Sequence, residues 1–118
     1  MAYVLVVDDD PRVLALLRDA LSIAGHDVTT AEDGAAGLRA YAARRPDVLI
    51  TDLMMPKRSG IDLVFAVSRR DPAAVIIAIS GVGESFLQAG MAVGIARVFA
   101  KPFDVRDVVA AVVELSRA

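Results

Sequence analysis

Short apolar runs of strand length alternate with longer segments of helical periodicity along the whole chain. Three of the five apolar runs are nearly continuous, which is typical of parallel strands covered by helices on both faces. This alternation predicts an α/β fold with a doubly wound, five-stranded parallel sheet and right-handed crossovers. The more polar run, Asp27–Ala31, is expected at an edge of the sheet. The predicted strands are Tyr3–Val7, Asp27–Ala31, Val48–Asp52, Ala74–Ser80 and Ala96–Ala100.

Five helices are predicted to alternate with these strands. Pro11 suits the first turn of the first helix, and Gly25 suits the position that follows its end. Asp104 suits the N-cap of the last helix, because its carboxylate can accept a hydrogen bond from a free backbone N–H. The predicted helices are Arg12–Ala24, Gly34–Arg44, Ser59–Arg70, Gly83–Val93 and Asp104–Ala118.

Length and composition limit the classes of protein to which the chain can belong. Its 118 residues suffice for one packed domain, and we assign residues 1–118 to a single domain. The net charge is −2 and no basic run is present, so we expect no direct contact with nucleic acid. No uncharged stretch approaches the roughly 20 apolar residues of a membrane span. Without a signal peptide pattern or any cysteine, the sequence favours a cytoplasmic protein that does not bind membranes.

Polar side chains lie at the carboxyl ends of four of the predicted strands: Asp8–Asp10, Asp52, Ser80 and Lys101. In a doubly wound sheet these ends meet at one edge, where ligands bind. Converging carboxylates repel one another unless a cation is present, and Mg²⁺ prefers such oxygen ligands. Asp52 is suited to act as a nucleophile toward phosphorus, with Lys101 and Ser80 binding phosphoryl oxygens. The alternatives to this site are that Asp8–Asp10 form a solvated turn, that Ser80 caps a helix and that Lys101 is an ordinary surface lysine.

Four segments together resemble the receiver domain of two-component response regulators: Val6–Pro11, Asp52–Pro56, Ser80–Gly81 and Lys101–Phe103. The resemblance covers the whole chain in the right order. It implies a flavodoxin-like sheet with strand order 2-1-3-4-5. It also implies a phosphoprotein, a single-domain regulator of the chemotaxis type. Such a protein takes a phosphoryl group from a sensor histidine kinase, or from a histidine phosphotransfer protein, in a Mg²⁺-dependent reaction on Asp52.

The same resemblance implies roles for the residues around Asp52, which is itself also a ligand of the metal. Asp8 and Asp9 match the acidic pair that holds Mg²⁺, and Met54 matches the position whose backbone carbonyl binds it. Ser80 and Lys101 match the hydroxyl and the lysine that bind the phosphoryl group. Signalling then passes to an output protein through protein–protein contact, and the sequence does not identify that partner.

The chain departs from the family pattern near the end of the last strand. Val98 stands three residues before Lys101, where the family has Tyr or Phe, and the aromatic residue is Phe99. In the family, the ring of that Tyr or Phe moves as part of the switch on phosphorylation. Side chains alternate faces along a strand, so Phe99 is expected to point away from the usual position of this ring. Phe86 and Met91 belong to an uncharged fourth helix that is apolar on more than one face. We interpret the face formed by the fourth helix, fifth strand and fifth helix as a partner surface, with a homodimer as one use of it.

Two further expectations concern the phosphorylated state and the single histidine. Met54 and Val82 match the positions that line the approach of water to the phosphoryl group in the family. Because both are apolar, we expect slow self-dephosphorylation. His26 follows Gly25 in a turn, and we expect it to be solvated, with no part in the site.

Three alternatives to a stand-alone receiver remain open at the level of sequence. The first is a Mg²⁺-dependent phosphatase of the aspartyl-phosphate type. Such enzymes usually need a second Asp where this chain has Met54, so we expect no enzyme with a separate substrate. A second alternative is a receiver-like scaffold that binds partners without phosphorylation. The third is a receiver fragment of a larger regulator.

Overall fold

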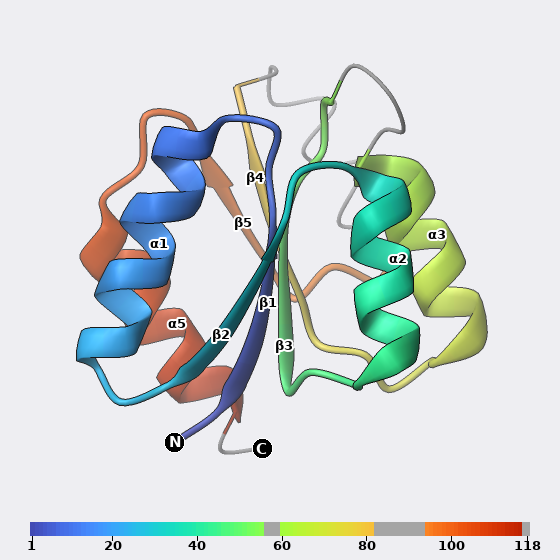
Figure 1. Ribbon diagram of the computed structural model, residues 1–118, viewed down its shortest axis with the longest axis horizontal. Coiled ribbons are helices and arrows are strands. Elements are labelled where there is room, and N and C mark those ends of the chain that lie inside the picture. The colour runs from blue at the N-terminus through green and yellow to red at the C-terminus, as the bar shows by residue number, and fades with distance from the viewer. Residues whose placement is uncertain (56–59, 82–93, 117–118) are drawn as a thin grey trace.

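The computed structural model describes residues 1–55, 60–81 and 94–116, and within them it contains one five-stranded sheet (Figure 1). All strands are parallel, and their order is β2-β1-β3-β4-β5, which confirms the predicted topology. The edge position predicted for β2 is also confirmed. The strands are β1 (Tyr3–Val7), β2 (Asp27–Ala31), β3 (Val48–Asp52), β4 (Ile76–Ser80) and β5 (Arg97–Ala100).

Four helices cover the two faces of the sheet among the described residues. Figure 1 shows α1 and α5 together on one face, and α2 and α3 together on the other. The predicted helix Gly83–Val93 lies outside the described residues, so the expectation of five helices stays a prediction. No helix in the described part of the chain is long and apolar enough to span a bilayer. The helices are α1 (Pro11–Ile23), α2 (Gly34–Ala43), α3 (Gly60–Arg70) and α5 (Val105–Ser116).

Most element boundaries agree with prediction to within one or two residues, and local hydrogen bonds explain the differences. Helix α1 already begins at Pro11, because the Asp10 side chain caps it by accepting from the Arg12 N–H. Strand β4 begins at Ile76, two residues later than predicted, because the Ala74 N–H donates to Asp71 O in a turn.

Two apolar clusters, one on each face of the sheet, form the core. The cluster under α1 and α5 includes Leu17, Leu21 and Val112, whereas the cluster under α2 and α3 includes Leu63 and Val67. Adjacent apolar residues of β1, β3, β4 and β5 contribute to opposite clusters, as strand geometry requires. The central strands β1, β3 and β4 are buried along their whole length, which explains their nearly continuous apolar sequences.

The same alternation separates the two residues that depart from the family pattern. Val98 packs against the cluster under α2 and α3, and Phe99 packs against the cluster under α1 and α5. The prediction that Phe99 points to the opposite face from Val98 is therefore confirmed. Phe86 and Met91, which were assigned to the partner surface, lie outside the described residues.

The expectation that His26 is solvated is wrong. Only 9% of the residue is exposed, and its Nδ1 accepts a hydrogen bond of 3.0 Å from the Ala2 N–H. Its Nε2 is buried and has no hydrogen-bond partner among the residues that the structure describes. Burial, with a smaller contribution from the charged N-terminus, lowers the pKa of His26. The turn at Gly25, with a φ of +95°, directs the chain back into the molecule and so carries the imidazole inward.

Candidate functional site

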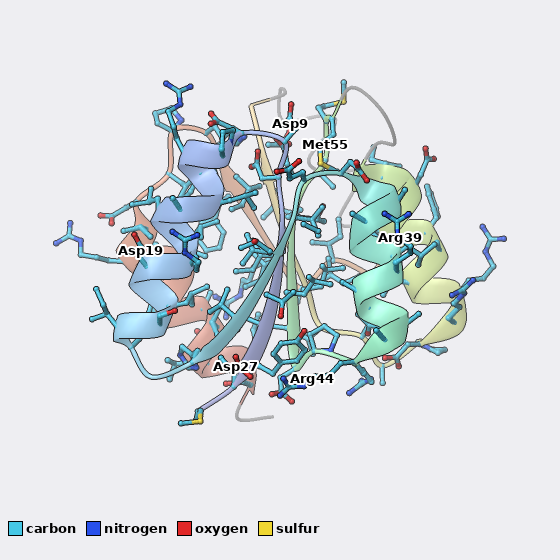
Figure 2. The ribbon with its side chains drawn as sticks, in the orientation of Figure 1. Asp9, Asp19, Asp27, Arg39, Arg44 and Met55 are labelled. Carbon is cyan, nitrogen blue, oxygen red and sulfur yellow. The ribbon has the colours of Figure 1, made fainter. Side chains whose placement is uncertain are left out.

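Three carboxylates lie together at the carboxyl edge of the sheet. Asp8 follows β1 directly and Asp52 ends the neighbouring strand β3, so the pairing of these strands places them side by side. Their side chains are almost fully buried, with exposed fractions of 2% and 6%. Asp9 is exposed, and Figure 2 shows it beyond the strand ends. Oxygen atoms of all three carboxylates lie within 4.8 Å of one another, a spacing that suits a shared metal ion.

Lys101 joins the two buried carboxylates. Its Nζ lies 2.9 Å from Asp52 Oδ2 and 3.2 Å from Asp8 Oδ2. The lysine follows β5, and its backbone N–H donates to Ser80 O at 2.8 Å, which ties this end of β5 to the end of β4. The bond between Lys101 and Pro102 is cis. One ammonium group therefore lies where a phosphoryl group on either carboxylate would meet it.

Backbone N–H groups hold the remaining oxygen of each buried carboxylate. The Asp10 N–H donates to Asp8 Oδ1 at 2.9 Å, and the Met54 N–H donates to Asp52 Oδ1 at 3.0 Å. Each carboxylate is thus fixed at one oxygen by the main chain and at the other by Lys101. This arrangement restricts the rotation of both groups, so a reacting atom needs little reorganisation to reach them.

The electrostatic balance of the site follows from burial and from these contacts. Burial is the largest influence on Asp8 and raises its pKa, with the nearby Asp52 charge acting in the same direction. Burial opposes the charge of Lys101, but its hydrogen bonds and charge interactions with Asp52 and Asp8 raise its pKa overall. The lysine therefore stays protonated, and it partly offsets the repulsion between the carboxylates.

The structure places Ser80 and Met54 at the same edge. Ser80 ends β4, is fully buried and follows Ile79, which is the register partner of Asp52. Met54 lies two residues beyond Asp52 and is 53% exposed. Val82, which was assigned to the approach of water, lies outside the described residues. Asp10 caps α1 and pairs with Arg12.

Sequence reasoning missed Gly60, a residue that touches the site through the backbone. A Cβ atom at this position would lie 1.7 Å from the Asp52 carbonyl oxygen and 2.8 Å from Leu53 Cα. The first turn of α3 therefore packs directly on the chain that carries Asp52. The sequence gives one indication of this contact: a glycine stands near the start of the predicted helix, although most other residues have a higher helix propensity.

The fold and the site together define a class: small α/β domains with an acidic cluster and one lysine at the carboxyl edge of a 2-1-3-4-5 sheet. Residues 4–113 match the model of the response regulator receiver domain family. The chain therefore belongs to this family.

Curated relatives and solved structures agree with this assignment. The transcriptional regulatory protein PrrA of Mycobacterium tuberculosis is 40% identical over 117 residues, which are 97% of this chain and 49% of PrrA. KdpE of the same species is 37% identical over 110 residues, 93% of this chain and 49% of KdpE. The chain thus spans about half the length of these curated relatives.

Two solved structures illustrate the similarity of fold. A response regulator receiver domain protein from Clostridium thermocellum is 30% identical, with a TM-score of 0.91 over 99% of this chain and 95% of that one. The response regulator TrrA of Thermotoga maritima, solved in complex with Mg²⁺ and BeF, is 26% identical. Its TM-score is 0.88, over 98% of this chain and 99% of that one.

Proposed function

We propose that this receiver accepts a phosphoryl group on Asp52 from a sensor histidine kinase or a histidine phosphotransfer protein. The observation that carries the proposal is the pairing of a buried Asp52 with Lys101 at 2.9 Å inside an acidic cluster. A carboxylate in this setting is held in place, and the charge that it gains on phosphorylation has a cation beside it.

The donor set fits a hard divalent cation, and Mg²⁺ is the proposed cofactor. Asp8, Asp9 and Asp52 offer carboxylate oxygens within 4.8 Å of one another, and Met54 is proposed to add its backbone carbonyl. When bound, the ion would neutralise negative charge on the transferred phosphoryl group. The structural alternative, a solvated acidic turn, does not account for the near-complete burial of Asp8 and Asp52.

The transfer is a displacement at phosphorus. One Asp52 oxygen forms a bond to phosphorus while the bond to the donor imidazole nitrogen breaks, and that nitrogen keeps the electron pair. Lys101 then exchanges its contact with the Asp52 carboxylate for an oxygen of the phosphoryl group. The Ser80 hydroxyl donates to another oxygen. The protein modifies itself and is not an enzyme with a separate substrate.

The output is proposed to be protein–protein contact, in the cytoplasm, through the face that includes β5 and α5. Val98 replaces the usual aromatic ring, so the change that starts at Ser80 reaches this face through a smaller side chain. A homodimer is one proposed form of the active state. Because the matched relatives are longer transcriptional regulators, a receiver within a longer regulator is the second candidate, and in it DNA contact would belong to another part of the protein.

Phosphorylation in the test tube distinguishes these proposals from a phosphorylation-independent scaffold. The wild type and Asp52→Asn are incubated with Mg²⁺ and acetyl phosphate, and the intact masses are measured. We expect the wild type alone to gain one phosphoryl group. No gain, together with no binding of beryllofluoride, would favour the scaffold.

A further inference from the structure

A groove between α2 and α3 lies away from the phosphoacceptor site. It has a volume of about 220 Å³ and is lined by Leu38 on α2 and by Ala66, Arg69 and Arg70 on α3. This volume is below the roughly 300–1,000 Å³ of sites that hold small molecules, so it suits one inserted side chain. Arg69 and Arg70 end α3, which places them toward the sheet edge opposite Asp52.

Unpaired arginines gather on this side of the molecule. Among the described residues, six of the nine arginines form an ion pair with a carboxylate, and the other three do not. These three are Arg39, Arg69 and Arg70, all on α2 or α3 and all exposed. Figure 2 shows Arg39 on α2, on the other side of the sheet from Asp19 of α1. The paired arginines are Arg12, Arg18, Arg44, Arg45, Arg97 and Arg106.

The acidic residue nearest in sequence does not neutralise this group. Asp71 follows Arg70 directly, but its carboxylate binds Arg45 and accepts a hydrogen bond of 2.8 Å from the Tyr41 hydroxyl. These two contacts, Arg45 first, lower the pKa of Asp71, so its charge is already satisfied. The same contacts join the end of α2 to the end of α3 and so hold the groove in shape.

We propose that the α2–α3 groove binds an acidic segment of a partner protein. An apolar side chain of the partner fills the space over Leu38 and Ala66, and flanking carboxylates pair with the guanidinium groups of Arg39, Arg69 and Arg70. The lining is mixed: Leu38 and Ala66 add apolar surface beside Arg69 and Arg70, which a protein segment can contact and a uniformly charged polyanion cannot. The helix dipole favours positive side chains at the carboxyl end of α3, which accounts for Arg69 and Arg70. It does not account for the unpaired Arg39 on the neighbouring helix.

This surface does not overlap the phosphoacceptor site, so the proposal does not rest on phosphorylation. A partner held there would remain bound whether or not Asp52 carries a phosphoryl group. The surface would then keep a partner close to the receiver, while the phosphoacceptor edge remains free for the donor.

The experiment measures fluorescence anisotropy of a labelled amphipathic peptide built from Glu, Leu and Ala, at low and physiological salt. The full chain is expected to bind this peptide and not a counterpart with Lys in place of Glu. Arg69→Glu/Arg70→Glu should weaken binding by tenfold or more, and Arg69→Lys/Arg70→Lys should retain most of it. Ala66→Gln should weaken binding by filling the groove. The single variant Arg69→Glu is compared with Arg18→Glu, which makes an equal charge change on α1. The affinity of Arg18→Glu should stay within about twofold of the wild type.

Several results would overturn the proposal. They are no binding by the wild type, equal losses for Arg18→Glu and Arg69→Glu, or tighter binding to a DNA duplex or to anionic vesicles than to the Glu peptide. Circular dichroism checks that each variant is folded. If the double Glu variant unfolds, Arg69→Gln/Arg70→Gln takes its place, and unchanged affinity in that variant would also reject the proposal.

Discussion

Replacing Gly60 by alanine tests how the fold positions Asp52. In most helices this change stabilises, by about 0.5–1 kcal/mol, because alanine loses less backbone entropy. Here the new Cβ would lie 1.7 Å from the Asp52 carbonyl oxygen, whereas ordinary contact begins near 3.4 Å. The first turn of α3 and the end of β3 must therefore separate by about 1.7 Å, since no rotamer change can move a backbone carbonyl.

The cost of this separation exceeds the gain in propensity. Overpacking typically costs about 1–3 kcal/mol, and a clash with backbone belongs at the upper end, so we expect a net loss of about 2 kcal/mol. This corresponds to a fall in Tm of roughly 8 °C or more for a domain of this size. A displacement of more than 1 Å at the nucleophile is expected to slow phosphorylation of Asp52 by acetyl phosphate about a hundredfold. Thermal unfolding and intact-mass kinetics measure the two effects.

Gly81→Ala provides a matched control at the same edge of the sheet. Among the described residues, a Cβ on Gly81 would meet only Lys101 Cβ, at 4.0 Å, which is ordinary contact. This variant should therefore keep the stability of the wild type to within about 1 kcal/mol. The reasoning would be refuted if Gly60→Ala were as stable and as readily phosphorylated as Gly81→Ala.

Further predictions concern charge, burial and the fate of the phosphoryl group. Without Mg²⁺, Lys101→Ala should cost about 1–3 kcal/mol in urea unfolding, because two buried carboxylates lose their shared cation; no cost would contradict the geometry. The pKa of His26 is lowered by folding, so its stabilising effect is complete above about pH 6.5 and is lost as the pH falls below it. Unfolding at pH 7.5 and 5.5 should show a smaller acid loss in His26→Gln, and equal losses would contradict this. Tyr41→Phe should cost about 1 kcal/mol in urea unfolding, because it removes the hydrogen bond to Asp71; an unchanged midpoint would argue against that bond. Met54→Asn should speed loss of the phosphoryl group, and slower loss than in the wild type would show that Met54 does not limit the access of water.

The sequence was sufficient for the features that depend on chain order and strand period. Parallel strands end at one edge, so Asp8, Asp52 and Lys101 could be brought together before any distance was known. The opposite orientations of Val98 and Phe99 followed from strand alternation alone. Helix ends were predicted within about two residues wherever a capping residue or proline marked them.

Features that depend on close approach between distant segments were not predictable. The contact of Gly60 with Asp52 requires the packing distance between α3 and β3, which no local pattern encodes. His26 was misjudged because a Gly-His-Asp turn looks solvated, while its burial depends on how the turn packs against the N-terminal residues. That Arg69 and Arg70 have no ion pair within the described part of the chain also depends on tertiary contacts, since Asp71 is engaged by residues about 30 positions away.

The central claim is that Asp52, rather than Asp8 or Asp9, carries the phosphoryl group. The wild type is phosphorylated with acetyl phosphate and Mg²⁺ and then reduced with borohydride, which converts an aspartyl phosphate to homoserine. Peptide mapping by mass spectrometry then locates the homoserine. We predict that it appears only at position 52. Homoserine at position 8 or 9, or none at position 52 in protein that has gained a phosphoryl group, would contradict the account.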